Sequence, residues 1–450
     1  MHCLIEKLAG CQAEDVFWYT PTARPVTASM LLPAVQSIPC EKWRGKRIGI
    51  GQMPVLEFVT TLIFLDGLAQ AILLLPAEDD AVARAARLKA ADIDYVLENE
   101  GLNFSKLLEP EEDKPLEKSK LTPSINRSID IATAWLLPTS GTTGTPKLIS
   151  HSYASLTRSM VDRRMGDEYV WGSLYSLRRF AGLQVFLQSW MSVTPLILID
   201  EGDALTVALL HLAELGCNAL SATPSMWRKI AMNPTFDQLQ LKQITLGGEI
   251  VDQAVLDMLK NRFPVARITH IYASTETGVG FVVRDGKSGF PAAYLENSPT
   301  GASIRVDEEN HLQFLSGPSS DAPPQSAAQW LDSGDVVQLN GDRVHFLGRA
   351  NGCINVGGNK VMPEEVETVI KELAEVAFVQ VRARKSAMMG SLVEAAIKPA
   401  PGIAFDTAFN KKITAHCRSR LDAFKVPAFI VEATEIALTA SGKISRASIQ

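Results

Sequence analysis

Short apolar segments alternate with helical patterns in the first hundred residues, and this alternation limits the fold more than any other sequence feature. An apolar segment at 47–50 precedes a helical pattern at 54–68 and an apolar run at 71–75. A second cycle has a helical pattern at 80–91 and an apolar segment at 95–97. Alternation of this kind is typical of βαβ units, so the chain is predicted to build a parallel sheet with helices against it.

The alternation continues further along the chain, between residues 153 and 281. Its apolar segments lie at 195–199, 219–222 and 243–246. Residues 107–128 interrupt the pattern, because they are rich in Glu, Lys, Pro and Ser, and we expect them to form an exposed connection.

The composition changes at 316–329, where Pro, Ser, Asp, Gln and Ala predominate, and short strand-like pieces with glycine turns follow up to residue 346. Beyond 363 the helical patterns and strand-like segments are 364–374, 377–381, 392–397, 409–421 and 428–431. With 450 residues the chain is long enough for about two to three domains. We predict an α/β fold with a large layered N-terminal domain (1–350), which includes a small β-rich subdomain, and a small α+β C-terminal domain (351–450).

Charge and cysteine usage exclude some classes of protein. The formal net charge is −6, and acidic and basic residues are interspersed, so no basic face is expected for nucleic acid. The six cysteines are far apart, without the spacing of a disulfide scaffold, and are predicted to be reduced thiols in a cytoplasmic protein.

The sequence favours neither a signal peptide nor a membrane span. Charged residues such as Glu6 and Asp15 break the start of the chain, so no signal peptide is expected there. Glu57 and Asp66 interrupt the apolar stretch 56–75, which therefore fits a buried helix and strand better than a membrane span. No membrane partner is predicted.

The strongest local motif follows the apolar segment 132–137. Its small hydroxylated residues and glycines expose backbone N–H groups that can surround an anion, and a lysine adds a further donor. It is not a Walker-type loop, because no Gly-Lys-Ser/Thr triplet occurs. The residues predicted to bind phosphates are Thr139, Ser140, Gly141, Thr142, Thr143, Gly144 and Lys147. Lys147 is expected to support the loop rather than perform chemistry.

This loop resembles the signature of the adenylate-forming superfamily, which comprises acyl-CoA synthetases, adenylation domains of peptide synthetases and luciferases. Four further stretches are similar to that family in the same order: 247–249 with 272–276, then 330–335, 348–358 and 439–446. Taken singly, each has an ordinary alternative: Tyr272 as a core aromatic, Asp335 as a turn residue and Lys443 as a solvated lysine. Five motifs in order favour the family.

The resemblance implies roles for these residues. Adenine would lie between two stretches, with the Tyr272 ring available for stacking; the residues are Gly247, Gly248, Glu249, Tyr272, Ala273 and Ser274. Ala273 departs from the family, where glycine is usual. Thr275 would contact phosphate and Glu276 would hold Mg²⁺. Asp335 would accept hydrogen bonds from the ribose hydroxyls, close to Arg349.

The resemblance also implies a mobile C-terminal domain. This domain would carry the catalytic lysine, Lys443, and rotate about a hinge at Asn351. The alternative interpretation of Asn351 is an ordinary loop residue without a hinge role. Gly357 and Gly358 would line the channel for a thiol, because glycines permit close passage of a pantetheine arm.

The acyl pocket is expected around Arg179, Phe180 and Gly182. Amino-acid-activating relatives place an Asp in this segment, and none occurs between Val170 and Gly182, so an α-amino acid is disfavoured. Arg179 would recognise a carboxylate, with pairing to a nearby surface acid as the alternative.

The predicted reaction is ATP-dependent activation of a small carboxylic acid to an acyl-adenylate, then transfer to a thiol, with Mg²⁺ as cofactor. Coenzyme A is the first expectation for the thiol and a separate acyl carrier protein the second, since no carrier site follows the last motif. A catalytically silent adenylate-binding protein is a third alternative. The protein is expected to be a monomer or homodimer.

Overall fold

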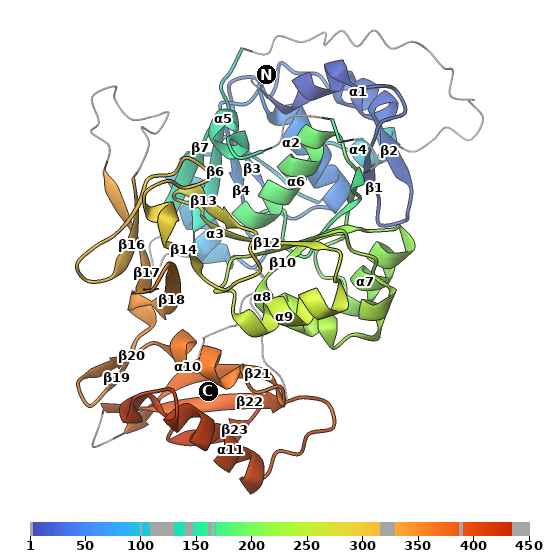
Figure 1. Ribbon diagram of the computed structural model, residues 1–450. Helices are drawn as coiled ribbons and strands as arrows, with labels where there is room; N and C mark the ends of the chain where they lie inside the picture. The colour runs from blue at the N-terminus through green and yellow to red at the C-terminus, as the bar shows by residue number, and fades with distance from the viewer. Residues whose placement is uncertain are drawn as a thin grey trace.

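The computed structural model describes residues 3–99, 101–108, 130–139, 147–160, 164–165, 168–315, 329–386 and 390–433. Within this part the chain forms a layered α/β unit, a small β-sheet beside it (orange in Figure 1) and a C-terminal α+β part (red), as the sequence predicted. The predicted connection 107–128 and the segment 316–329 lie almost entirely outside the described residues.

The first cycles of apolar and helical segments form a mainly parallel sheet. Its strand order is β5-β3-β4-β6-β7, and only the last pair, β6 and β7, is antiparallel. The strands are β3 (Arg47–Ile50), β4 (Ala71–Leu74), β5 (Tyr95–Leu97), β6 (Ala134–Thr139) and β7 (Lys147–His151), with α2 (Val55–Leu65), α3 (Ala81–Ala90) and α4 (Phe104–Leu107) between them.

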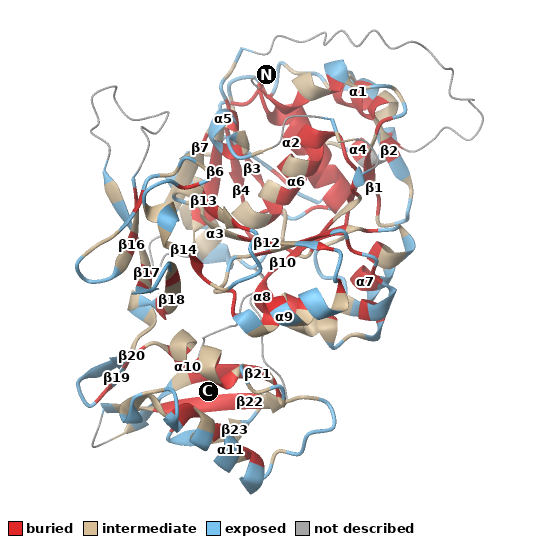
Figure 2. Ribbon diagram, viewed as in Figure 1, coloured by how far each residue is buried: buried red, intermediate tan, exposed pale blue. Residues whose placement is uncertain are grey.

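Helix α2 explains the most apolar stretch of the sequence. Every one of its residues is buried, and β4, which follows it, is buried as well (Figure 2). A helix without an exposed face belongs in the interior of a large domain. Among the described residues no helix has both the length and the apolar character needed to cross a membrane.

A second, larger sheet has the strand order β13-β12-β11-β10-β8-β9-β1-β2 and is parallel except for the pairs at its two edges. Its strands are β1 (Val16–Tyr19), β2 (Pro25–Thr27), β8 (Trp171–Ser173), β9 (Leu196–Ile197), β10 (Ala219–Ala222), β11 (Gln243–Gly247), β12 (Arg267–Ser274) and β13 (Gly278–Val283). The helices around it are η1 (Leu4–Gly10), α1 (Ala28–Ser37), α5 (Tyr153–Thr157), α6 (Phe180–Ser192), α7 (Leu205–Glu214), α8 (Pro224–Ala231), η3 (Pro234–Gln238) and α9 (Gln253–Arg262).

The small β-subdomain is a sheet in the order β14-β18-β17-β16-β15. It comprises β14 (Phe290–Pro291), η4 (Ala292–Leu295), β15 (Ile304–Val306), β16 (His311–Leu315), β17 (Trp330–Asn340) and β18 (Arg343–Arg349). Its core is aromatic: Phe281, Phe290 and Phe314 are buried there, and Tyr272 and Phe346 pack against them.

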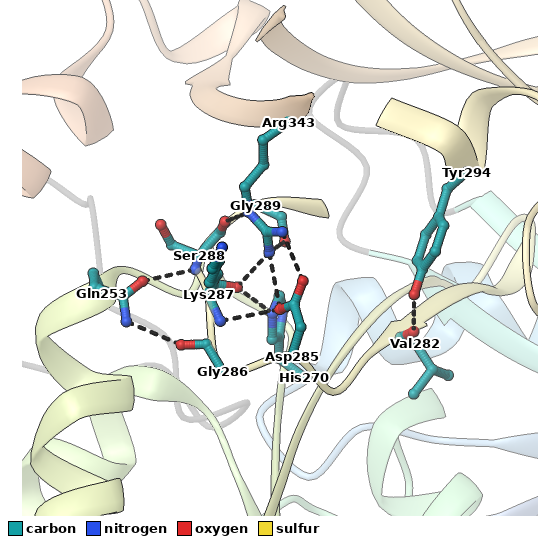
Figure 3. Close-up of polar contacts among 10 residues, drawn as sticks. All are labelled: Gln253, His270, Val282, Asp285, Gly286, Lys287, Ser288, Gly289, Tyr294 and Arg343. Carbon is teal, nitrogen blue, oxygen red and sulfur yellow. Dashed lines mark hydrogen bonds and ion pairs between the residues drawn. The ribbon is translucent and has the colours of Figure 1, made fainter. Parts of the chain in front are cut away.

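A polar network joins this subdomain to the large sheet (Figure 3). Arg343 of β18 pairs with Asp285 at an Nη1–Oδ2 distance of 2.7 Å and donates to backbone carbonyls of residues 287–289. His270 of β12 lies 3.0 Å from the Lys287 carbonyl, and Gln253 of α9 accepts from the Ser288 N–H. Side chains from β18, β12 and α9 thus all bind the turn before β14, and this holds the subdomain against the edge of the large sheet.

The C-terminal part is a compact α+β unit, as predicted. Its sheet has the order β20-β19-β22-β21, with β23 beside β22. Its elements are β19 (Ile354–Val356), β20 (Asn359–Val361), α10 (Pro363–Ile370), β21 (Val376–Ser386), β22 (Gly390–Pro399), α11 (Thr407–Arg418), η6 (Ala423–Lys425) and β23 (Phe429–Glu432). The predicted boundary after residue 350 falls within η5 (Ala350–Gly352), between strands of two different sheets, and remains a prediction.

One buried carboxylate links the C-terminal part to the large domain. Asp252, the N-cap of α9, lies 2.6 Å from the Nη2 of Arg228 and 3.9 Å from the Nζ of Lys371, which follows α10. Burial opposes ionisation of Asp252, but Arg228, Lys371 and the Val255 N–H outweigh it, so the pKa of Asp252 lies below its usual value.

We expect Asp252→Ala to lower the free energy of unfolding by about 3–5 kcal/mol, because it leaves the buried Arg228 without its partner. Asp237→Ala breaks an exposed Asp–Arg pair and should cost about 1 kcal/mol or less. Since the Asp252 pKa is lower in the folded chain, its contribution is present above the unfolded value of about 4 and is lost as the pH falls through the folded value. Denaturant unfolding at about pH 7 and about pH 3 measures both effects. Equal losses for the two variants at neutral pH would contradict this account.

Candidate functional site

The two ends of the predicted phosphate loop meet at the edge of the first sheet. Thr139 ends β6 and Lys147 begins β7, and the two residues are paired across the antiparallel strands. The Thr139 hydroxyl lies 3.5 Å from the Lys147 carbonyl. The remaining predicted loop residues, Ser140, Gly141, Thr142, Thr143 and Gly144, lie outside the described residues.

The first predicted adenine segment follows β11 at its carboxyl end. Gly247 is the last residue of that strand, and its carbonyl accepts a hydrogen bond from the Tyr175 hydroxyl at 3.1 Å. Gly248 has a φ of +82°, which favours glycine there, and it turns the chain toward Glu249. The Glu249 carboxylate accepts from the Ser225 N–H in the first turn of α8 at 2.9 Å.

The second segment ends in the tight connection between β12 and β13. Ser274 pairs with Gly278, and the Ser274 hydroxyl accepts the Thr277 N–H at 3.1 Å. Thr275 and Glu276 form the tip of this turn, and Glu276 is exposed. A carboxylate at the tip of a fixed turn is free to reach a metal ion or solvent.

His151, which the sequence reasoning missed, binds this turn from the other sheet. It is the last residue of β7, is 8% exposed, and its Nε2 lies 2.8 Å from the Thr275 carbonyl oxygen. Its position four residues after Lys147 placed it close to the predicted phosphate loop in the sequence. Its hydrogen-bond partner, however, lies 124 residues further along the chain, so the contact could not be predicted.

The structure places Tyr272 and Asp335 in direct contact. The Tyr272 hydroxyl donates a hydrogen bond to Asp335 Oδ2 at 2.5 Å. The tyrosine ring lies nearly parallel to Phe281, Phe314 and Phe346, with ring centroids 5.1, 5.2 and 5.4 Å away. Burial and the charge of Asp335 raise the pKa of Tyr272 well above its usual value, so its hydroxyl stays protonated and donates.

Arg349 completes this cluster from β18. Its Nε lies 3.0 Å from Asp335 Oδ1, and its Nη1 donates to the Ser333 carbonyl at 2.6 Å. Asp335 itself is 7% exposed, whereas the Arg349 side chain is about half exposed. Tyr272, from the adenine set, and Arg349, from the ribose set, therefore meet at the buried carboxylate of Asp335.

The predicted acyl-pocket residues lie at the start of α6. Arg179 is its N-cap and forms an ion pair with Glu78, which matches the alternative stated for this arginine. Phe180 places its ring 5.6 Å from the ring of His151. Gly182 packs against the Ser176 carbonyl, where a Cβ atom would clash.

Arg178, which precedes the predicted pocket residue Arg179, is buried. It is 2% exposed, lies 3.1 Å from Glu201, and donates to the carbonyls of Gly51 and Met53. Its guanidinium lies 4.4 Å from the centre of the Phe58 ring. It lines a cavity of about 40 Å³ together with Tyr175 and joins the two large sheets. Sequence alone does not tell which of two adjacent arginines points inward.

The predicted hinge and thiol-channel residues are exposed. Asn351 lies in η5 between β18 and β19. Gly357 and Gly358 form the tip of the β19–β20 hairpin, where the Gly358 N–H donates to Asn355 at 2.9 Å. Lys443 lies outside the described residues.

Comparison with known protein families finds two matches along the chain. The sequence model of the AMP-binding enzymes matches residues 61–309, and that of the AMP-binding enzyme C-terminal domain matches 365–443. The first match alone covers more than half of the chain.

Curated relatives share about a quarter of their residues with this chain. Surfactin synthase subunit 1 of Bacillus subtilis is 27% identical over 79% of the chain, although the chain spans only 11% of that relative's length. The 2-succinylbenzoate–CoA ligase of Listeria innocua is 26% identical, covering 72% of the chain and 71% of the relative. The D-alanine–D-alanyl carrier protein ligase of Staphylococcus aureus is 26% identical, covering 71% of each.

Solved structures agree with the fold. The crystal structure of the anthranilate CoA ligase AuaEII with anthranoyl-AMP has a TM-score of 0.76 to this chain at 18% identity, covering 98% of this chain and 95% of that one.

We expect Tyr272→Phe to weaken AMP binding roughly tenfold, because the buried Asp335 loses a donor that orients it. The aromatic packing is retained in this variant. Tyr294→Phe is the matched control: its hydroxyl, in η4 of the small subdomain, donates to the Val282 carbonyl of β13 at 3.3 Å (Figure 3), and the AMP affinity of this variant should stay within about twofold of wild type. Titration calorimetry measures both, and equal affinities for the two variants would contradict the role of Tyr272.

Proposed function

The chain belongs to the family of AMP-binding enzymes, and we propose that it activates a carboxylic acid with ATP and then passes the acyl group to a thiol. The observation that carries the proposal is the contact of Tyr272 and Arg349 with Asp335. It brings an aromatic face, a carboxylate and a guanidinium together at one point. This set suits an adenine ring and ribose hydroxyls.

In the first half-reaction an oxygen of the substrate carboxylate attacks the α-phosphorus of ATP, and pyrophosphate leaves. Two anions must approach one another, so the site has to supply positive charge and donors. The segment 139–147 is proposed to hold the β and γ phosphates, and Lys443 to neutralise charge on the α-phosphate.

The exposed carboxylate of Glu276 fits a Mg²⁺ ion that also binds phosphate oxygens, since Mg²⁺ in such sites takes one or two carboxylates. When bound, Mg²⁺ would neutralise phosphate charge. Thr275 and Glu276 are proposed to face the phosphates from the β12–β13 turn.

In the second half-reaction the thiol attacks the acyl carbonyl and AMP leaves. The proposed hinge at Asn351 lies where the chain passes from one sheet to another, which suits rotation of the C-terminal part. The exposed hairpin tip with Gly357 and Gly358 is proposed to line the path of the thiol arm.

Coenzyme A is the proposed acceptor. A CoA ligase among the relatives that matches over most of its own length supports this choice. The carrier protein ligase with equal coverage supports a separate acyl carrier protein as the second candidate. The acid is proposed to lie near Phe180 and the first turn of α6. The absence of an Asp between Val170 and Gly182 disfavours an α-amino acid.

A panel of aryl, fatty, dicarboxylic and amino acids tests the proposal, with pyrophosphate release as the readout and hydroxylamine to trap the acyl-adenylate. At least one non-amino acid should stimulate release, and a hydroxamate of that acid should form. If no acid stimulates pyrophosphate release, the proposal fails.

We expect Lys443→Ala to lower acyl-adenylate formation by at least about a hundredfold, because a charge that stabilises the transition state is removed. The same variant should make thioester from supplied acyl-adenylate at close to the wild-type rate. Single-turnover assays of the two half-reactions measure this split, and an equal loss in both would remove Lys443 from its assigned role.

A further inference from the structure

His151 lies where three parts of the proposed site meet. It ends β7, the strand that leaves the phosphate segment, and its ring packs 5.6 Å from the Phe180 ring of the proposed acyl pocket. Its Nε2 reaches the Thr275 carbonyl in the turn that carries Glu276. It is buried among these elements, with 8% of its surface exposed.

The partners of the imidazole define its tautomer. The Thr275 carbonyl oxygen only accepts hydrogen bonds, so the Nε2 that lies 2.8 Å away must carry a hydrogen. The Nδ1 lies 3.3 Å from the Ser155 hydroxyl, which itself donates to the Ser152 carbonyl at 3.0 Å. Burial lowers the pKa of His151, with partial compensation from Thr275 and Glu276, so the neutral ring with hydrogen on Nε2 is favoured.

A hydrogen bond to the Thr275 carbonyl fixes the orientation of the whole peptide group between Thr275 and Glu276. The peptide group between Thr275 and Glu276 is planar, so fixing the direction of the carbonyl also fixes the N–H of Glu276 on the opposite side. Within the turn itself, the Ser274 hydroxyl holds the Thr277 N–H. The His151 hydrogen bond therefore ties the tip of the turn to the first sheet.

We propose that His151 is a positioning residue that holds the Thr275–Glu276 peptide in place for the nucleotide's phosphates. The effect on nucleotide binding rests on the proposed function, whereas the effect of His151 on the order of the turn does not depend on it. His151 touches neither nucleotide nor metal in this proposal and acts through the turn. Its contact with Phe180 also joins the turn to the wall of the proposed acyl pocket.

Three substitutions separate the hydrogen bond from the volume of the ring. His151→Gln can place an amide N–H near the position of Nε2, whereas His151→Asn is too short to reach Thr275. His151→Leu fills the space without a donor. Ser155→Ala is the control, because it removes only the neighbour of Nδ1 and a local cap of α5.

The first readout is hydrogen exchange of residues 272–279, which needs no substrate. Exchange in this segment should become at least about tenfold faster in the Leu and Asn variants, while the Gln variant and Ser155→Ala stay within about threefold of wild type. Unchanged exchange in folded Leu and Asn variants would overturn the inference whatever the activity. If the Leu variant does not fold, the Asn variant carries the test.

The second readout is acid-dependent pyrophosphate exchange. The KM for Mg·ATP should rise roughly tenfold in the Leu and Asn variants, more than the KM for the acid, and return toward wild type in the Gln variant. A Gln variant as impaired as the Leu variant would overturn the inference. Failure of the proposed function shows differently, as a wild-type protein that exchanges no pyrophosphate, and hydrogen exchange then decides the inference alone.

Discussion

The carboxylate of Asp335 imposes the constraint on which the rest of the site depends. A side chain that is 7% exposed needs donors for both oxygens, and they come from Tyr272 of the large sheet and Arg349 of the small subdomain. The two sheets must therefore meet at one point. The aromatic core around Tyr272 and the network centred on Arg343 (Figure 3) hold them there.

The elements of the fold could largely be predicted from the sequence, because their signals are local. The segments at 47–50, 54–68 and 71–75 became β3, α2 and β4, since periodicity and apolar runs depend on neighbours in the chain. The order of strands could not be predicted. The parallel pairing of β1 with β9, for example, joins segments almost 180 residues apart, such as Trp18 and Leu196, and follows from packing between distant parts of the chain.

The site shows the same division. The motifs located the segments that carry Gly247, Tyr272 and Asp335, and the structure brings the last two into contact. His151 was missed because its partner lies 124 residues away, and Arg178 because only burial distinguishes it from Arg179. The carboxylate-activating step is supported by more contacts than the thiol step, whose proposed residues Asn351, Gly357 and Gly358 are exposed.

The most direct test of the central claim follows the substrate's oxygen atoms. With the preferred acid labelled with ¹⁸O in its carboxyl group, attack of that carboxylate on the α-phosphorus puts one labelled oxygen into the AMP released after thiol transfer. Mass spectrometry of the nucleotide is expected to show AMP with a single ¹⁸O. Unlabelled AMP, or ADP as the product, would contradict the account.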